Sequence, residues 1–218
     1  MSISILLVDD HKILREGLRA VLEAQSGLEV IGEADNGREA IREAQRLRPD
    51  VVVMDIAMPE INGIEAARTL REAGPLPRIV MLSMHAHTEY IFRALQAGAD
   101  GYVVKESATG EVADAIRSVY HGRRFLSASI ADSVIDDYVR RRELPVDEDP
   151  LMRLSSRERE VLQLVVEGRS TAEIADRAAL SPKTVETYRS RLMRKLEITN
   201  LAELVKFAIK HGLTSVDQ

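Results

Sequence analysis

The segment ISILLVDD, residues 3–10, is an apolar run that ends in two carboxylates. Three later segments repeat this pattern: VVVMD at 51–55, RIVMLS at 78–83 and GYVVK at 101–105. Short continuous apolar runs are typical of strands that are buried on both faces of a parallel sheet. Parallel strands end at one edge of such a sheet, where ligands bind. The polar residues expected to meet at this edge are Asp9, Asp10, Asp55, Ser83 and Lys105.

The segments between these runs have the apolar spacing of amphipathic helices, with repeats of three and four residues. In the segment that follows residues 3–10, the residues on one helical face are Ile13, Leu14, Leu18, Val21 and Leu22. With a further strand expected from about Leu28, five strand–helix repeats between Ile3 and about Gly122 predict an α/β fold, with a parallel sheet covered by helices on both faces. Residues 123–150 are expected to form a linker that contains one helix and an acidic loop between Pro145 and Pro150.

Residues 151–218 have a purely helical pattern, and four helix starts are predicted from N-cap chemistry. An N-cap side chain accepts from the free N–H groups of a first turn. The cap pairs are Ser155 with Glu158, Ser170 with Glu173, Ser181 with Pro182, and Asn200 with Glu203. Only ALS, residues 179–181, separates the second and third helices, which is typical of a helix-turn-helix.

Composition excludes several classes of protein. The 218 residues are 45% hydrophobic and 30% charged, and none is Cys. No window approaches the roughly 20 apolar residues of a membrane span, and a disulfide framework or thiolate metal site is impossible. The N-terminus has no signal-peptide pattern, so we expect a cytoplasmic protein. Residues 1–150 carry 18 Lys and Arg against 26 Asp and Glu, a net −8, whereas residues 151–218 carry 12 against 9, a net +3. The basic part is the one expected to meet a polyanion.

The predicted sheet edge has the chemistry of a cation and phosphoryl site. Grouped carboxylates raise one another's pKa unless a cation lies among them. Mg²⁺, or Mn²⁺ in its place, prefers oxygen ligands, and Lys105 adds a positive point charge. Phosphoryl transfer requires this kind of positioning and charge neutralisation.

The LVDD pair, the DIAMPEINGIE segment around Asp55, the Ser83 strand and the AGADGYVVK run resemble the receiver domain of two-component response regulators. The resemblance covers residues 1–122 and implies a (βα)5 flavodoxin-like, doubly wound sheet of order 2-1-3-4-5. It also implies that a sensor histidine kinase phosphorylates Asp55. The further roles that it implies are Mg²⁺ ligation by Asp9, Asp10, Asp55 and the backbone carbonyl of Ala57, phosphoryl contacts by Ser83 and Lys105, and an aromatic switch at Tyr102, which fills the space that Ser83 leaves.

Residues 154–209, with REREVL, LSPKTVETYRS and MRKL as the telling pieces, resemble the LuxR-type helix-turn-helix. A receiver followed by this four-helix module is the architecture of the NarL/FixJ group of response regulators. The resemblance implies a transcription factor that binds double-stranded DNA, with an inverted repeat contacted by a homodimer. It assigns the dimer contact to the last helix, with Leu204, Val205 and Ala208.

The predicted recognition helix, residues 182–196, separates into two faces. The residues that the spacing directs toward the core are Val185, Tyr188, Leu192 and Leu196. The opposite face has three candidates for base contact: Glu186, Thr187 and Ser190. The candidates for phosphate contact are Lys183, Thr184, Arg191, Arg194 and Lys195, with one further hydrogen bond expected from the Tyr188 hydroxyl.

The chain departs from these families at three positions: Glu106 follows Lys105 where many receivers have Pro, Tyr188 stands where His is common, and Glu197 stands where Gly is common. His85 lies two residues after Ser83 and is expected to tune the loss of the phosphoryl group to water; His85 and His87 have no further ligand at metal-site spacing.

Three alternatives compete with a phosphorylation-controlled regulator. An aspartyl-phosphate hydrolase requires a second Asp where this chain has Ala57. A ligand-sensing LuxR regulator does not need the acidic residues. A phosphorylation-independent regulator of the same architecture stays open. The chain is expected not to be an enzyme, beyond slow self-phosphorylation from small phosphodonors and self-dephosphorylation.

Overall fold

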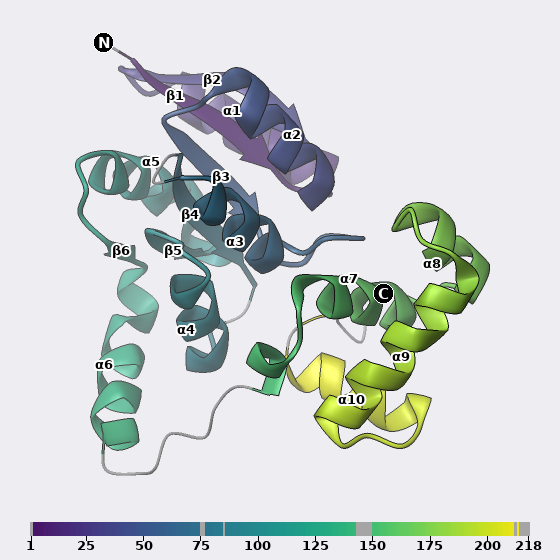
Figure 1. Cartoon of the computed structure of the whole chain (residues 1–218). Coiled ribbons are helices and arrows are strands. Elements are labelled where there is room, and N and C mark those ends of the chain that lie inside the picture. Colours follow the sequence, from purple (N-terminus) through teal and green to yellow (C-terminus); the bar gives the residue numbers. More distant parts are fainter. Residues whose placement is uncertain (1, 75–76, 85, 143–149, 212, 214–218) are drawn as a thin grey trace. The chain divides into compact units, whose positions relative to one another are not determined.

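The computed structural model describes residues 2–74, 77–84, 86–142, 150–211 and 213 (Figure 1). The chain divides into two compact units, Met1–Glu143 and Leu144–Gln218, and each is described by itself.

The first unit is built on a parallel sheet of six strands within the described residues, in the order β2-β1-β3-β4-β5-β6. The strands are β1 (Ile3–Val8), β2 (Leu28–Ala34), β3 (Val51–Asp55), β4 (Arg78–Ser83), β5 (Gly101–Val104) and β6 (Phe125–Leu126). The predicted fold class and the order 2-1-3-4-5 are confirmed. The order reverses at β1 and β3, and this places the Asp9–Asp10 pair beside Asp55.

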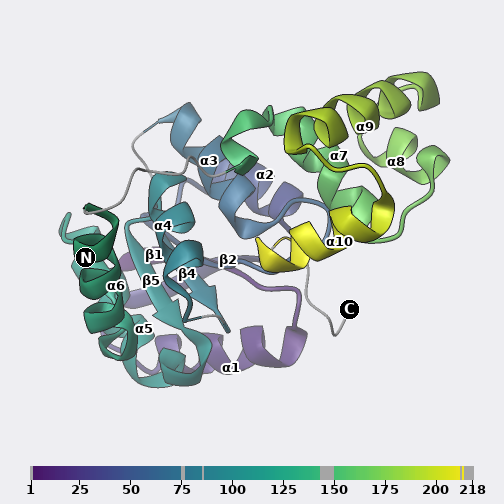
Figure 2. The ribbon, with the colours of Figure 1, turned by 90° about the horizontal axis from the view of Figure 1, so that it is seen from below.

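Helices cover both faces of the sheet, and each face has its own apolar core (Figure 2). One face carries α1 (Lys12–Glu23) and α5 (Ala108–Tyr120), and the other carries α2 (Gly37–Leu47), α3 (Gly63–Ala73) and α4 (Thr88–Gln96). Alternate strand residues enter opposite cores, as the strand period of two requires: Ile5 and Leu7 lie in one, Leu6 and Val8 in the other. This double burial is why the strands read as unbroken apolar runs.

The first unit extends beyond the predicted receiver boundary at residue 122. Phe125 and Leu126 form β6, which pairs with Gly101 and Tyr102 of β5. The helix expected in this segment is α6 (Ala128–Arg142), and it buries Ile130 and Val134 in the core beside α4. The prediction that the linker begins at residue 123 is therefore corrected, because these contacts make β6 and α6 part of the first unit. The acidic loop that begins at Pro145 lies outside the described residues up to Pro150.

The second unit contains the four predicted helices α7 (Ser156–Val166), α8 (Thr171–Arg177), α9 (Pro182–Leu196) and α10 (Leu201–Lys210), after a short 3-10 turn, η2 (Pro150–Arg153). All four predicted N-caps are confirmed. Ser155 and Ser170 form complete capping boxes, and Ser181 accepts from the Thr184 N–H with Pro182 in the first turn. Asn200 accepts from the Glu203 N–H, whereas the Glu203 carboxylate accepts from the Thr199 N–H.

The end of α9 contains a strained residue at the predicted departure from the family. Glu197 is the C-cap and has φ of 59°, in the left-handed region that favours Gly. A left-handed non-Gly residue costs roughly 1–2 kcal/mol, and the greater unfolded-state entropy of Gly returns roughly 0.5–1 kcal/mol of that. We therefore expect Glu197→Gly to raise the free energy of unfolding of the second unit by about 0.5–1 kcal/mol, measured by urea denaturation.

Glu167 provides a matched control for this prediction. It is the C-cap of α7 but has φ of −73°, so Gly offers no relief there and Glu167→Gly is expected to lower stability. Changes of the same sign at both caps would contradict backbone strain as the cause.

Candidate functional site

The predicted polar residues all lie at the carboxyl edge of four adjacent strands. Asp9 and Asp10 follow β1, Asp55 ends β3, Ser83 ends β4 and Lys105 follows β5. Three of them have almost no exposed surface: Asp9 (1%), Asp55 (2%) and Ser83 (1%). The sheet order, and not proximity in the sequence, brings them together.

Lys105 is shared between two buried carboxylates. Its Nζ lies 2.7 Å from Asp55 Oδ2 and 2.8 Å from Asp9 Oδ2. Burial by itself lowers the pKa of Lys105, but the two carboxylates outweigh it and the pKa is raised above its ordinary value. Lys105 is therefore a fixed positive charge that neutralises part of the acidic edge.

The pKa of Asp55 is raised in spite of this partner. Burial raises its pKa from 3.8 to about 6, and the neighbouring Asp9 adds to the rise. Lys105 and the Ala57 N–H, which donates to Asp55 Oδ1 over 3.3 Å, work in the opposite direction without cancelling it. A second positive charge beside Asp55 would stabilise its ionised form.

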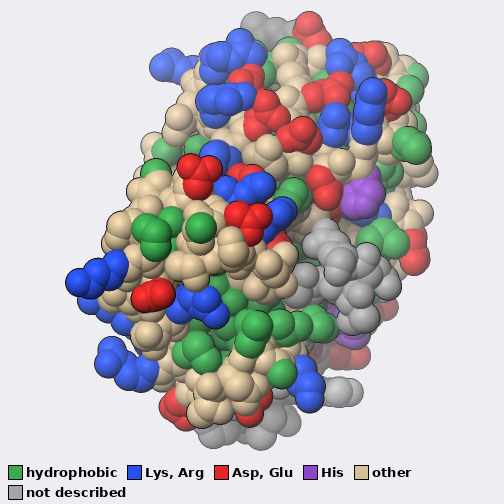
Figure 3. Space-filling model, turned by 90° about the vertical axis from the view of Figure 1, so that its right-hand side faces the viewer, with side chains coloured by type: hydrophobic (Ala, Val, Ile, Leu, Met, Phe, Trp, Pro, Cys, Tyr) green, Lys and Arg blue, Asp and Glu red, His purple; other side chains and the backbone are tan. Residues whose placement is uncertain are grey.

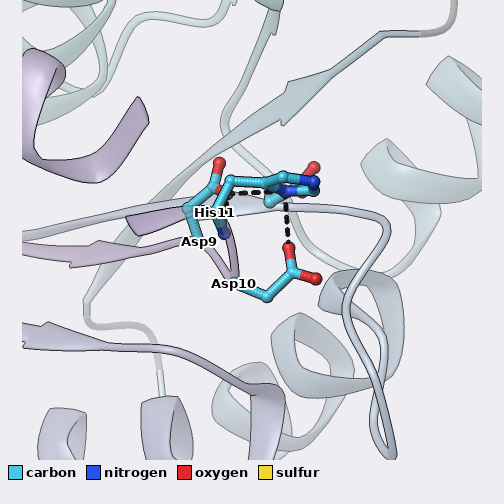
Figure 4. A group of neighbouring side chains, drawn as sticks. Asp9, Asp10 and His11 are labelled. Carbon is cyan, nitrogen blue, oxygen red and sulfur yellow. Dashed lines mark hydrogen bonds and ion pairs between the residues drawn. The ribbon is translucent and has the colours of Figure 1, made fainter. Parts of the chain in front are cut away.

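His11 joins the carboxylates at this edge (Figure 4). The backbone N–H of His11 donates to Asp9 Oδ1 over 2.8 Å, and the imidazole Nδ1 lies 2.9 Å from Asp10 Oδ1. One ligand atom from each of Asp9, Asp10, His11 and Asp55 lies within 4.8 Å of the others, a spacing that suits a metal ion. Three of the four donors are carboxylates, which fits Mg²⁺ or Mn²⁺. His11 is not among the predicted metal ligands, and its position next to Asp10 in the sequence was the available signal.

Tyr102 is already inside the protein, with no exposed surface. Burial raises the pKa of its phenol, and a hydrogen bond with Ser83 opposes that rise. The phenol of Tyr102 thus lies next to Ser83, and its movement into a space that Ser83 leaves stays a prediction. His85, which is expected to tune the loss of the phosphoryl group, lies outside the described residues, and His87 is the exposed N-cap residue of α4.

In the second unit, α9 has the two faces that its spacing predicts. Val185 and Leu192 are buried in the core, and Tyr188 and Leu196 pack against it. The outer face forms a surface hollow of about 570 Å³. The hollow is lined by Lys183, Glu186, Thr187, Ser190, Arg191 and Arg194.

Three predicted DNA contacts of α9 have partners within the protein. Lys195 Nζ lies 2.6 Å from Glu158 Oε2, and because Glu158 is buried, this ion pair holds the end of α9 against the start of α7. Lys195 and the Ser155 cap outweigh burial and lower the pKa of Glu158. The Thr184 hydroxyl lies 2.8 Å from Ser181 Oγ, and the Thr187 hydroxyl donates to the Lys183 carbonyl. Lys195 thus has a structural role that its spacing did not reveal.

The predicted dimer contacts are corrected by burial. Leu204 and Ala208 lie in the core of the second unit, with 2% and 0% of their surface exposed. Side chains that fill their own core have no surface to offer a second copy. Val205 is half-buried and stays a prediction. Leu201 at the start of α10 is half exposed, which was not predicted.

Charge is mixed on the face that Figure 3 shows. There, Lys and Arg side chains lie among Asp and Glu side chains (Figure 3). No helix in the described part of the chain has the length and apolar character needed to cross a bilayer.

Both units match known protein families. Residues 5–117 match the response regulator receiver domain, and residues 152–208 match the bacterial regulatory proteins of the luxR family. The chain is 38% identical over 213 residues to the transcriptional regulatory protein MctR of Rhizobium johnstonii, covering 98% of this chain and 96% of that protein. It is 39% identical over 215 residues to the response regulator UvrY of Escherichia coli, covering 99% and 97%.

A solved structure shares the fold. The two-component response regulator of the LuxR family from Aurantimonas sp. SI85-9A1 has a TM-score of 0.62 and 40% identity, over 64% of this chain and 99% of that chain. The receiver match alone spans more than half of the present sequence. The chain therefore belongs to the NarL/FixJ group of response regulators, with a receiver domain and a LuxR-type DNA-binding domain that serve the regulation of transcription.

Proposed function

We propose that Asp55 accepts a phosphoryl group from a sensor histidine kinase and that its phosphorylation controls DNA binding by α9. The observation that carries this proposal is the placement of Lys105 between the buried carboxylates of Asp55 and Asp9. A cation in this position can stabilise a phosphoryl group on Asp55 as readily as it stabilises the carboxylates. Slow self-phosphorylation from small phosphodonors and self-dephosphorylation are the only reactions that we assign to the chain itself.

The donor set indicates which residues would hold a divalent cation. Asp9, Asp10 and Asp55, with the carbonyl of Ala57, would bind Mg²⁺ or Mn²⁺. When bound, the ion offsets the repulsion between the attacking carboxylate and the incoming phosphate. These four residues fit a hard cation because each offers an oxygen atom, and the proposed ligand set does not include the neighbouring His11 nitrogen.

The residues of the chain then perform a simple displacement. A carboxylate oxygen of Asp55 attacks the phosphorus of a phosphohistidine, and the P–O bond forms as the P–N bond breaks and imidazole leaves. Lys105 pairs with a phosphoryl oxygen in place of the Asp55 carboxylate, and the Ser83 hydroxyl donates to another. The product carries nearly two negative charges where one stood, which biases the Ser83–Tyr102 pair toward a new arrangement.

On the DNA side, α9 is proposed as the recognition helix. The basic side chains of its hollow, those of Lys183, Arg191 and Arg194, are proposed to contact DNA phosphates. Glu186 and Ser190 are proposed to contact the edges of the nucleobases. Two copies of the second unit would bind the half-sites of an inverted repeat, with Val205 near their contact. Because the target is chromosomal DNA, we place the protein in the cytoplasm.

The test of the proposed function compares operator binding with and without phosphorylation. A duplex is selected from a random library with the phosphorylated full chain and then titrated in gel shifts with Mg²⁺, with and without phosphoramidate. We expect phosphorylation to tighten binding about 5- to 150-fold, as is typical of coupling between two sites. Equal affinities at complete phosphorylation would favour the alternative of a phosphorylation-independent regulator.

Two substitutions in α9 separate DNA contact from folding. Arg191→Ala removes an exposed cation from the hollow, so we expect weaker binding to all sequences. The slope of the logarithm of the binding constant against the logarithm of the salt concentration should become shallower by about one, the value of one phosphate contact. Lys195→Met leaves Glu158 buried without its cation, so we expect a loss of about 1–3 kcal/mol in the unfolding free energy with little change in salt dependence. Salt titration of binding and urea denaturation measure the two effects. The reverse pattern would show that Lys195 is the phosphate contact.

A further inference from the structure

The loop that carries Lys105 is held by three polar side chains that the phosphoryl-transfer chemistry does not use. Ser107 ends the 3-10 turn η1 (Lys105–Ser107) after β5, Glu111 lies in the first turn of α5, and Ser127 lies between β6 and α6. Ser127 is completely buried, and the other two are half-buried. We refer to Ser107, Glu111 and Ser127 as the Glu111 cluster.

The cluster hydrogen-bonds to Val104, the residue that precedes Lys105. The Val104 N–H donates to Ser127 Oγ over 3.0 Å, and Ser107 Oγ lies 3.1 Å from the Val104 carbonyl oxygen. The backbone pairing of β5 with β6 stops at Tyr102 and Leu126. The Ser127 hydroxyl therefore continues this edge of the sheet by one bond, to a backbone N–H that would otherwise lie buried without a partner on that side.

One carboxylate connects both hydroxyls to the start of α6. Glu111 Oε2 accepts from the Ser127 hydroxyl and lies 3.0 Å from Ser107 Oγ. The N–H of Ala128, the first residue of α6, donates to Glu111 Oε1 over 3.4 Å. A negative charge in this place also favours the N-terminus of α6.

The proton count makes the cluster sensitive to the position of Val104. Each hydroxyl has a single proton to donate. The proton of Ser127 goes to Glu111, which leaves its oxygen free to accept from Val104. The Ser107 hydroxyl proton is shared between two acceptors, because Ser107 Oγ lies 3.1 Å from the Val104 carbonyl oxygen and 3.0 Å from Glu111 Oε2. If Val104 moves away, the hydroxyl donates to the carboxylate alone.

We propose that the Glu111 cluster positions Lys105 and transmits its displacement to α6, the helix from which the chain continues toward the DNA-binding unit. This inference rests on the proposed function, in which Lys105 turns from Asp55 to a phosphoryl oxygen. Val104 is held at both of its peptide groups, so movement of the Lys105 loop either breaks the Val104–Ser127 bond or carries Ser127 and α6 with it. By linkage, contacts that hold α6 in place also favour the unphosphorylated position of Lys105.

The test measures amide hydrogen exchange in α6 of the full chain, before and after phosphorylation of Asp55 with phosphoramidate and Mg²⁺. We expect exchange at residues 131–134 to become about tenfold faster in the wild type, within the range typical of coupling between two sites. Glu111→Gln is expected to reduce this ratio to about twofold or less, because a neutral amide cannot hold both hydroxyls and the Ala128 N–H.

Two controls separate coupling from a general loss of structure. Glu106→Gln removes the same charge next to Lys105 but outside the cluster, and the wild-type ratio is expected. Ser107→Thr keeps a hydroxyl at a half-buried position and is expected to behave as wild type, whereas Ser107→Ala is expected to resemble Glu111→Gln. These variants avoid substitution at the fully buried Ser127.

Each outcome decides the question. A wild-type exchange ratio in Glu111→Gln at equal phosphorylation would overturn the inference, and so would an equal loss of the ratio in Glu106→Gln. A wild type that is phosphorylated on Asp55 with no change in α6 overturns the inference alone. A wild type that takes no phosphoryl group on Asp55 overturns the proposed function as well.

Discussion

Asp55→Asn is expected to abolish phosphorylation and, at the same time, to make the unmodified receiver more stable. The variant has no carboxylate to attack phosphorus, so labelling by phosphoramidate should fall to background. The gain in stability follows from burial: the pKa of Asp55 rises from 3.8 in its ordinary range to about 6 in the folded protein. A rise of this size corresponds to as much as about 3 kcal/mol against the ionised folded state.

The direction of the pH dependence can be worked out from this pKa. Above about pH 6 the side chain is ionised in both the folded and the unfolded state, and the full penalty is present. As the pH falls from about 6 to 3.8, the folded state takes up the proton first and the penalty disappears. The stability advantage of Asp55→Asn should therefore be largest near pH 7.5 and vanish near pH 4. Lys105 retains Asp9 as a partner in the variant.

Urea denaturation in EDTA at several pH values measures this advantage. Asp114→Asn removes a carboxylate that is mostly exposed, so it is the matched control and should change stability by less than about 0.5 kcal/mol. Adding Mg²⁺ should stabilise the wild type more than Asp55→Asn, because the variant lacks one of the three carboxylates proposed to bind the ion. A variant less stable than wild type at pH 7.5 without divalent ions would contradict the assigned role of burial.

Gly63→Ala is expected to produce the largest loss of stability. A Cβ at Gly63 would lie 2.1 Å from the carbonyl oxygen of Asp55, a contact that only a shift of backbone can relieve. The Gly63 N–H also donates to the Ile56 carbonyl, so the start of α3 is fixed against the end of β3. We expect a loss of about 3–5 kcal/mol in the unfolding free energy of the first unit. Phosphorylation of Asp55 should slow as well, because its backbone must move.

Gly17 is the matched control for this substitution. It lies within α1 on an exposed face, and a Cβ there meets nothing within 4 Å. Gly17→Ala should raise stability by about 0.5–1 kcal/mol because Ala loses less backbone entropy in a helix. Thermal denaturation of both variants measures the contrast. A loss in Gly63→Ala no larger than about 1 kcal/mol would show that α3 can move away from β3 without cost.

The sequence alone determined the architecture and the identity of the acidic residues. Strands buried on both faces must be apolar throughout, so runs such as VVVM at 51–54 identify a parallel sheet from composition alone. Its carboxyl edge follows from topology, which is why Asp9 and Asp55 could be placed together. The helix starts of the second unit were equally predictable, because an N-cap such as Ser155 acts on N–H groups within three residues.

The tertiary structure alone decided which side chains have partners from distant segments. Lys195 reads as one more basic residue on a recognition helix, and only the packing of α9 against α7 pairs it with Glu158. Leu204 reads as part of an apolar stripe, and only the core shows that the second unit itself buries it. Local spacing tells which face of a helix a residue lies on, but not which element will cover that face.

The acidity of Asp55 and the assembly of the Glu111 cluster belong to this second group. The first depends on how deeply the sheet buries a carboxylate beside Lys105, and the second joins Ser107, Glu111 and Ser127 from three elements. Solvent exclusion and hydrogen-bond geometry depend on distances between segments that are far apart in the chain. The sequence by itself therefore determined what kind of site this protein carries, and folding decided how strongly its charges interact and what they are connected to.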